Sequence, residues 1–351
     1  MQKNILRKGT SVLLGVLLAA SLALTACGGK QTETPQNSQE KTEQNGQKQD
    51  GGAEKAASFD LKYRSGATSG CFYPVSASMA EFLPQDISGL TNVTVTPGQG
   101  QSNVQAVQDG VCDIAFAKLP GTILGVEGKE PFQGPCDKVR NLMYFYDEAF
   151  HLVVLSDSGI NSVADLKGKS LSTQTVGNQA EQMTREVLAA YGMEYSDLKK
   201  VSNVNSYDDS VQQMKDGIVD AFTFANAPPV AILTDLASSR DIKIISIGAD
   251  EMKKVLEMNK GYVERVIPAG TYEFQNEDIT TFGGAVHVIV NESMDEELAY
   301  EIVKSTVEHL STIQEAHVAF KDLTAEKMGQ ELALPFHPGA ERYFREKGVI
   351  K

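Results

Sequence analysis

The sequence SGATSGCFYPVSASMAEFL, residues 65–83, joins an expected strand at Phe59–Tyr63 to an expected helix. Pro74 suits the first position of that helix, because the N–H group that proline lacks has no partner there. The apolar residues that follow have helical spacing: Val75, Met79, Phe82 and Leu83. A helix that begins just after a strand presents free N–H groups and the positive end of its dipole. The stretch by itself fits both an anion site and an ordinary strand-to-helix turn.

A sequence pattern occurs twice, 107 residues apart. VQAVQDGVCD at 104–113 corresponds to VQQMKDGIVD at 211–220. Both indicate an amphipathic helix that ends in Asp-Gly, where glycine supplies the left-handed conformation after the last turn. Both lead into an apolar strand, at 114–117 and 221–225. The repeat predicts two similar α/β lobes.

A second repeat links two strands. HLVVL at 151–155 precedes Ser-Asp-Ser, and HVIV at 287–290 precedes Asn-Glu-Ser, and a helix is expected after each. Two similar lobes joined by two similar strands would produce both repeats. Chance likeness between common helix-to-strand units is the alternative. His151 and His287 begin these strands, and we interpret them as structural residues.

Further turns lead from strands into helices. A glycine-rich loop, PGQGQ, leads to Ser102 as the expected N-cap. A turn at Gly177 leads to Asn178, which forms a capping-box pattern with Glu181. The diproline at 228–229 ends another strand. Because open α/β sheets bind ligands beyond the carboxyl ends of their strands, these helix starts together predict a cleft between the lobes.

The N-terminal segment predicts export. Residues 1–27 have a basic start and an apolar run at 12–24 that is too short for a comfortable membrane span. LTAC at 24–27 resembles a lipobox, which makes Cys27 the expected lipidation site; a simple secretory signal is the alternative. Residues 28–57 are polar, and we expect a disordered tether. The expected location is the outer face of the cytoplasmic membrane, with the protein held there by lipid.

Charge and motifs exclude several functions. The whole chain has a formal charge of −14, and the signal carries three basic and no acidic residues, so the remainder carries −17. This argues against nucleic acid and anionic lipid as ligands, but not against a small anion held by local N–H groups. The histidines show no metal-ligand spacing, and no nucleotide-cofactor or nucleophile motif is present. We therefore expect no metal, no cofactor and no enzyme activity.

Three cysteines remain after the signal, and their spacing does not fix any pairing. They are free or partly paired: Cys71, Cys112 and Cys136.

Four segments together resemble a known family. These are SGCFYPVS at 69–76, HLVVLSDSGINSVADLKGK at 151–169, PAGTYEFQNEDI at 268–279 and FHPGA at 336–340. They are similar to GGTYYPVG, HLVVRADSGIKSLADLKGK, PAGTYPGQDEDV and LHPGA of the TAXI-type solute-binding subunits of tripartite ATP-independent periplasmic (TRAP) transporters. The likeness covers essentially all of residues 58–351.

The resemblance implies an α/β, type II periplasmic binding protein fold, in which two lobes joined by two hinge strands close on a ligand. Lobe 1 would comprise 58–152 and 282–351, and lobe 2 would comprise 153–281. The ligand would be a small organic acid similar to glutamate, glutamine or 2-oxoglutarate, delivered to a TRAP permease for ion-gradient-driven uptake. An ABC-transporter binding protein of the same fold and a ligand-sensing lipoprotein are the alternatives.

By motif position, the resemblance also implies a set of ligand contacts: Ser69, Phe72, Tyr73, Asn103, Gly177, Asn178, Tyr272 and Gln275. Two loops depart from the family. Its TGGS is PGQG at 97–100 here, and its GSGT is GNQA at 177–180. Carboxamides replace hydroxyl groups in the second loop, and they both donate and accept hydrogen bonds. We therefore expect these loops to change ligand specificity.

Overall fold

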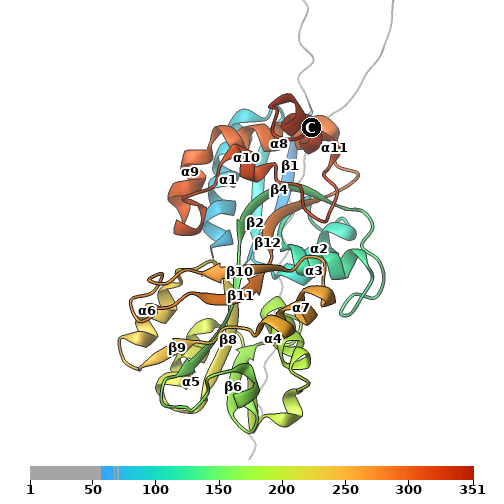
Figure 1. Ribbon diagram of the computed structural model, residues 1–351. Helices are drawn as coiled ribbons and strands as arrows, with labels where there is room; N and C mark the ends of the chain where they lie inside the picture. The colour runs from blue at the N-terminus through green and yellow to red at the C-terminus, as the bar shows by residue number, and fades with distance from the viewer. Residues whose placement is uncertain (1–56, 67, 69–70) are drawn as a thin grey trace, which may run out of the picture. The chain divides into compact units, whose positions relative to one another are not determined.

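The computed structural model describes residues 57–66, 68 and 71–351 (Figure 1). The expected signal at 1–27, Cys27, the tether up to residue 56 and Ser69 lie outside the described residues. Within the part of the chain that is described, no helix has the length and apolar character that crossing a membrane requires.

Lobe 1 is built on a five-stranded sheet in the order β2-β1-β3-β12-β4. Strands β1, β2 and β3 are parallel, and β12 is antiparallel to both β3 and β4. The strands are β1 (Phe59–Arg64), β2 (Leu90–Thr96), β3 (Ile114–Lys118), β4 (Val139–Asp147) and β12 (Ala285–Asn291). The helices of lobe 1 are α1 (Phe72–Asp86), α2 (Gly100–Gln108), α3 (Leu119–Val126), α8 (Glu296–Glu308), α9 (Leu310–Ala316), α10 (Ala325–Met328) and α11 (Pro338–Glu346).

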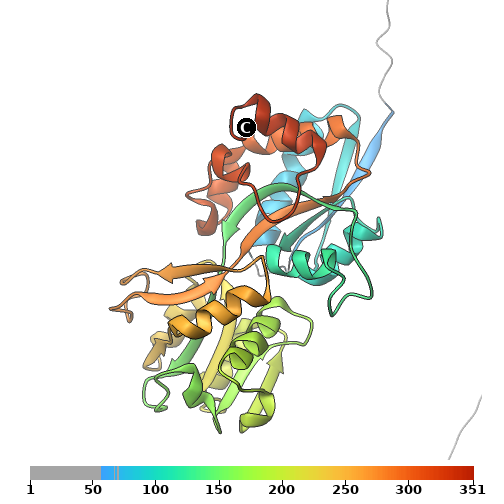
Figure 2. The ribbon, with the colours of Figure 1, turned by 45° about the vertical axis from the view of Figure 1, so that its right-hand side comes forward.

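Lobe 2 is built on a second five-stranded sheet in the order β7-β6-β8-β5-β9. Its strands are β5 (Ala149–Leu155), β6 (Ser170–Gln174), β7 (Lys200–Val204), β8 (Ala221–Asn226) and β9 (Ile242–Ile244). Its helices are α4 (Gln179–Ala190), α5 (Tyr207–Lys215), α6 (Ala231–Ala237) and α7 (Ala249–Met258). A two-stranded ribbon, β10 (Val263–Ile267) and β11 (Ile279–Gly283), lies between the two sheets (Figures 1 and 2).

The predicted repeat is confirmed by the topology. The helix-to-strand unit α2-β3 of lobe 1 corresponds to α5-β8 of lobe 2, and Gly110 and Gly217 after the two helices both have φ of +67°. In each sheet the next strand, β12 or β5, runs antiparallel to that unit's strand. The two aspartates that end the repeats also act alike: Asp113 accepts from the N–H of Lys62 at 2.7 Å, and Asp220 from that of Ser170 at 2.8 Å.

The chain passes between the lobes at other points than the sequence indicated. Residues 149–152, which we expected in lobe 1, form the first half of β5 in the second sheet. The crossing therefore falls at Glu148, whose N–H donates to Gly284 O at 3.0 Å beside the return crossing. A Cβ atom on Gly283 would lie 1.7 Å from Glu148 O, so only glycine allows this backbone approach. The repeat of HLVVL and HVIV located the similar strands β5 and β12, but the chain passes from one lobe to the other just before each of these strands begins.

Strand β5 is buried on both faces, which explains its continuous apolar run. Phe150, Leu152 and Val154 belong to one hydrophobic cluster of lobe 2, and Val153 and Leu155 belong to another. Lobe 1 has a single large cluster around its sheet and helices. Each lobe therefore has its own core.

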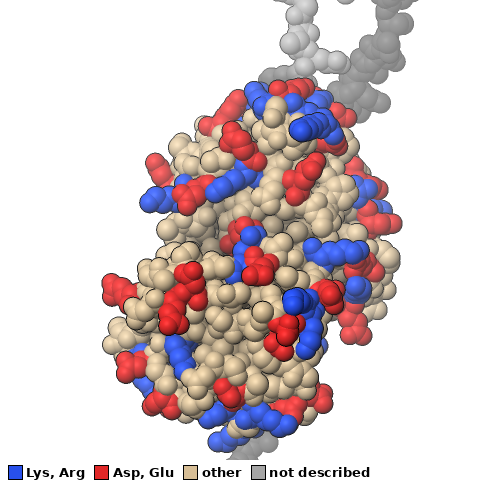
Figure 3. All heavy atoms as spheres, in the orientation of Figure 1, with Lys and Arg blue, Asp and Glu red and all other residues tan. Residues whose placement is uncertain are grey.

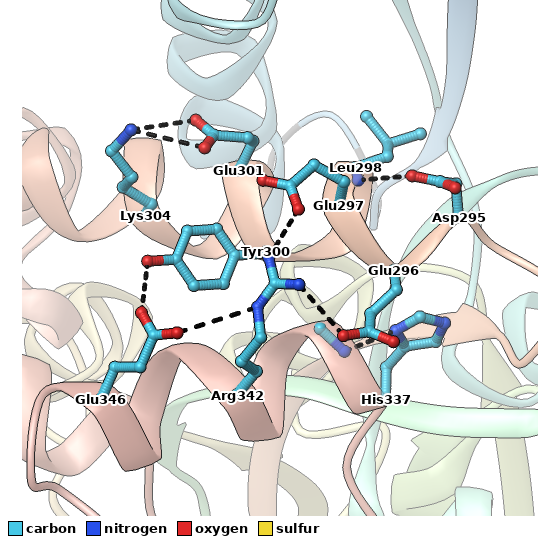
Figure 4. A network of polar contacts seen from close by, with 11 residues as sticks. Asp295, Glu296, Glu297, Leu298, Tyr300, Glu301, Lys304, His337, Arg342 and Glu346 are labelled. Atoms are coloured by element: carbon cyan, nitrogen blue, oxygen red, sulfur yellow. Dashed lines mark hydrogen bonds and ion pairs between the residues drawn. The ribbon is translucent and has the colours of Figure 1, made fainter.

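The outer surface of lobe 1 has a network of charged side chains between α8 and α11 (Figure 4). Asp295 caps α8 by accepting from the N–H of Leu298 at 3.0 Å. Arg342 pairs with Glu296 at 3.1 Å and lies 4.2 Å from the ring centroid of Tyr300. On the face shown in Figure 3, basic and acidic side chains are interspersed rather than gathered by sign.

Candidate functional site

A buried ion pair lies where the lobes join. Lys118 ends β3 of lobe 1, and its Nζ lies 2.5 Å from Oε2 of Glu148 at the crossing. The same Nζ donates to the carbonyl oxygen of Ala225 in β8 of lobe 2 at 3.3 Å. The Glu148 side chain is 1% exposed and that of Lys118 is 15% exposed. One ammonium group therefore connects lobe 1, the crossing and lobe 2, at the carboxyl ends of corresponding strands.

Burial and mutual attraction act in opposite directions on this pair. Burial raises the pKa of Glu148, and the nearby Lys118 ammonium opposes that shift. Burial by itself would lower the pKa of Lys118, but the Glu148 carboxylate together with Tyr207 and Cys71 more than offsets this effect, so the pKa is raised. Lys118 is therefore a cation at neutral pH, held in a place from which water is largely excluded.

Aromatic and thiol groups surround the pair. Cys71 Sγ lies 2.9 Å from the hydroxyl oxygen of Tyr146. Burial raises the pKa of the Cys71 thiol, which keeps it neutral. The Tyr207 hydroxyl donates at 3.2 Å to the same Ala225 carbonyl that Lys118 contacts. The thiol and the two phenol groups beside the ion pair can therefore form hydrogen bonds but carry no charge.

A cavity of about 300 Å³ adjoins Glu148. Its wall combines the end of β4, Pro228 of lobe 2, Arg265 of β10 and the segment 318–327 of lobe 1. Val266 and Val318 line it and are 52% and 57% exposed. The cavity thus lies between the lobes, and its volume is at the lower end of the range for small-molecule sites.

On the other side of the ion pair, helix α3 of lobe 1 contacts lobe 2. Asn259 donates to the carbonyl oxygen of Pro120 at 2.9 Å, and Lys260 pairs with Glu127 at 3.0 Å. A Cβ atom on Gly121 would lie 2.7 Å from Oε1 of Gln179, so the backbone of α3 meets the first residue of α4 closely. The start of α4 therefore faces lobe 1.

Four of the sequence-predicted contacts lie at helix starts. Phe72 and Tyr73 begin α1, and Phe72 stacks on Phe116 with ring centroids 4.7 Å apart. Gly177, with φ of +89°, and Asn178 precede α4. Asn178 caps that helix by accepting from the N–H of Ala180 at 2.9 Å, as predicted.

The expected role of Glu181 in the capping box is wrong. Glu181 lies 3.0 Å from the guanidinium of Arg185 and accepts from the Tyr195 hydroxyl at 3.1 Å, instead of turning back to the cap. Glu181 therefore contacts Arg185 of its own helix and Tyr195, which follows that helix in the chain.

Asn103 uses its polar atoms inside lobe 1. It is fully buried, its Oδ1 accepts from Arg64 Nε at 3.2 Å, and its Nδ2 donates at 2.8 Å to the carbonyl oxygens of Ser65 and Phe116. This side chain fastens α2 to β1 and β3. The expected N-cap at Ser102 is also wrong, because α2 begins at Gly100 and Ser102 donates back to Gln99 O.

Tyr272 and Gln275 are held within lobe 2. The Tyr272 hydroxyl lies 3.1 Å from His151 Nε2 and accepts from the N–H of Val230 at 3.2 Å. The Gln275 amide donates to three carbonyl groups of its own loop: those of Ile267, Pro268 and Glu277. No hydrogen bond or ion pair among the described residues joins either side chain to Lys118 or Glu148.

Lys118 and Glu148 were not predicted as site residues from the sequence. Lys118 was visible as a charge that ends the apolar strand IAFAK, and Glu148 as an acid between two apolar strands. Neither pattern indicates that the two side chains meet, because they come from segments that only the fold brings together. Within the described ranges, no group of three or more His, Cys, Asp or Glu side chains is placed to hold a metal ion. The three described cysteines are free and buried.

Comparison with known proteins shows the family of this chain. Residues 64–348 match the model of the NMT1-like family, and the chain belongs to that family. XAC2383 from Xanthomonas citri bound to ATP is similar in structure, with 14% identity, a TM-score of 0.50, and coverage of 83% of this chain and 96% of that chain. A putative L-cystine ABC transporter from Listeria monocytogenes has 12% identity, a TM-score of 0.48, and coverage of 77% and 99%.

An ancestral arginine-binding protein bound to arginine has 20% identity, a TM-score of 0.45, and coverage of 74% and 97%. At these identities the likeness concerns the fold. The α/β, type II periplasmic binding protein fold expected from the sequence is confirmed.

Proposed function

We propose that this protein is an extracytoplasmic solute-binding protein that captures a small organic acid between its lobes. The observation that carries the proposal is the Lys118 ammonium at the junction of the lobes, paired with Glu148, which lines a cavity of about 300 Å³. A buried cation attracts a carboxylate strongly, because little water screens the charges. A binding site of this kind needs no bound cofactor and no catalytic group.

The mechanism follows from the two separate cores. Because each lobe has its own core, the lobes can move as bodies while the crossings at Glu148 and Gly284 bend. A carboxylate that meets Lys118 would replace part of the contact between the ammonium and Ala225 O. The start of α1, which includes Tyr73, would then close over the solute. A micromolar dissociation constant requires about −8 kcal/mol, which a few charge-assisted hydrogen bonds and aromatic burial supply.

We further propose that the solute is passed to a TRAP-type membrane permease, and that lipid on Cys27 holds the protein at the outer face of the membrane. Support comes from the four sequence segments that resemble TAXI-type subunits, above all PAGTYEFQNEDI and FHPGA. An uptake assay tests this step. Solute uptake in the host should persist when ATP is depleted and stop when the ion gradient is dissipated, and dependence on ATP would assign the protein to an ABC transporter instead.

The binding step is tested by a thermal-shift screen of residues 28–351 against glutamate, glutamine, 2-oxoglutarate, succinate and several neutral sugars. A ligand at a hundred times its dissociation constant adds about 2.7 kcal/mol of stability, which gives a clear rise in the melting temperature. A rise with an acid supports the proposal. A rise with a sugar alone would contradict the organic-acid ligand and keep the binding role.

A further inference from the structure

One oxygen atom of Glu148 has unused hydrogen-bonding capacity. Both carboxylate oxygens are buried and lack a hydrogen-bond partner among the described residues; Oε2 has the ion pair with Lys118, whereas Oε1 has no partner of either kind. Glu148 also lines the cavity between the lobes. A buried carboxylate oxygen without a donor costs free energy, so such an atom beside a cavity points to a ligand that supplies the donor.

The other charged pair on this wall is more exposed. Asp147 and Arg265 form an ion pair at 2.7 Å, and both side chains are 31% exposed, although Oδ1 of Asp147 and Nε of Arg265 are themselves buried and have no hydrogen-bond partner among the described residues. Asp322 and Lys327 of lobe 1 also line the cavity and are exposed. Within the described lining, Glu148 is therefore the charged side chain that is almost wholly buried and has a carboxylate oxygen without a partner.

We infer that Glu148 selects solutes that carry an ammonium group next to their carboxylate, with Oε1 accepting from the ammonium while Lys118 faces the carboxylate. The inference rests on the proposed function and narrows its ligand class to zwitterions such as α-amino acids. Lys118 and Glu148 together have no net charge, so a solute with opposite charges side by side matches both. A 2-oxo acid of the same skeleton places a carbonyl oxygen where the ammonium would be. The carbonyl oxygen and the Glu148 carboxylate are both hydrogen-bond acceptors, so they form no hydrogen bond with each other.

The unaltered protein gives the first test, with ligand pairs that differ only in this group. The pairs are L-glutamate with 2-oxoglutarate, L-alanine with pyruvate, and L-leucine with 4-methyl-2-oxopentanoate. Dissociation constants are measured by titration calorimetry on residues 28–351. We expect at least one amino acid to bind, and to bind at least about tenfold more tightly than its oxo partner.

A variant then assigns the preference to one residue. Glu148→Gln keeps the shape and removes the charge, and it should reduce the preference for the amino acid to less than about threefold while leaving the affinity for the oxo acid unchanged or improved. Glu331→Gln is the matched control, because Glu331 is exposed and does not line the cavity. Circular dichroism verifies folding. If Glu148→Gln does not fold, Glu148→Asp is used; this variant withdraws the carboxylate from the solute and should also reduce the preference.

The outcomes separate this inference from the proposed function. An oxo acid that binds as tightly as its amino partner would overturn the inference and leave organic-acid binding intact. A preference for the amino acid that Glu148→Gln and Glu148→Asp both leave unchanged would overturn the role of Glu148. If no member of the three pairs binds, the organic-acid proposal fails and the inference fails with it.

Discussion

His151 and His287 occupy the same position in the two lobes. In the strand pairing, His287 lies opposite Ala117 of β3, and His151 lies opposite Phe224 of β8. Phe224 comes 107 residues after Ala117 in the chain. Both histidine side chains are fully buried. The offset equals that of the repeated helix-to-strand units, so the repeat extends to the register of the antiparallel strands.

The two histidines have different partners. His151 Nδ1 lies 2.8 Å from Ala149 O, and its ring stacks on that of Phe224 with centroids 4.5 Å apart. His287 lies between the Thr122 hydroxyl at 2.9 Å and Oδ1 of Asn141 at 3.0 Å. These contacts agree with the structural interpretation of both residues.

The first prediction concerns the pH dependence of stability. Burial lowers the pKa of His151 from 6.5 to about 4. The unfolded chain therefore binds the proton near pH 6.5 and the folded protein only near pH 4, so neutral His151 stabilises the fold fully above pH 6.5. That contribution, at most about 3 kcal/mol, is lost as the pH falls toward 4. Burial lowers the pKa of His287 to about 3, so its contribution to stability is lost over a pH range that extends lower, to about 3.

Urea denaturation between pH 4 and pH 8 checks this expectation. His151→Gln should be less stable than the unaltered protein at pH 7, and the gap in the free energy of unfolding should narrow as the pH falls from 6.5. A gap of constant size across this range would show that His151 does not titrate in the expected way.

The second prediction concerns the buried ion pair. Lys118→Met leaves the Glu148 carboxylate buried without its partner and should cost about 3 kcal/mol of stability. The double variant Lys118→Met, Glu148→Gln removes both charges and should regain part of that loss. Urea denaturation at pH 7 measures all three proteins.

A control for this cycle is Lys253→Met, because the Lys253–Asp250 pair is 74% and 84% exposed. It should leave stability almost unchanged, since water screens such pairs. If the double variant is no more stable than Lys118→Met, the loss comes from missing lysine packing rather than from an uncompensated charge.

The third prediction concerns Tyr73. This side chain is half-buried at the start of α1, so Tyr73→Ala should retain the fold and weaken solute binding about tenfold, through the loss of an aromatic contact of about 1.4 kcal/mol. Titration calorimetry measures the affinity, with the solute found in the thermal-shift screen. Tyr300→Ala, in the charged network of α8, is the control and should bind normally. Unchanged affinity in Tyr73→Ala would place the site elsewhere.

The fourth prediction separates structural from binding roles in the loop 268–277. The Gln275 amide donates to three carbonyl groups of its own loop, so Gln275→Glu removes those donors and should destabilise the protein by about 2 kcal/mol. Solute affinity, measured well below the melting temperature, should change less than threefold. A large loss of affinity with normal stability would instead support the ligand contact that the resemblance implied.

The sequence determined the local elements and the existence of two similar lobes. The Asp-Gly repeats located α2 with β3 and α5 with β8, because a helix that ends in Asp-Gly before an apolar strand is encoded by neighbouring residues. The cap at Asn178 was likewise predictable, since its side chain accepts from the backbone only two residues away.

The tertiary structure alone decided the crossings and the site. Glu148 and Gly284 mark the crossings because two distant backbones must pass closely there, and no local pattern records such an approach. The tertiary structure also assigned Asn103 and Gln275 to internal hydrogen bonds and brought Lys118 to Glu148. The partners of a buried polar group depend on segments far away in the chain, whereas a helix or a cap depends on its neighbours.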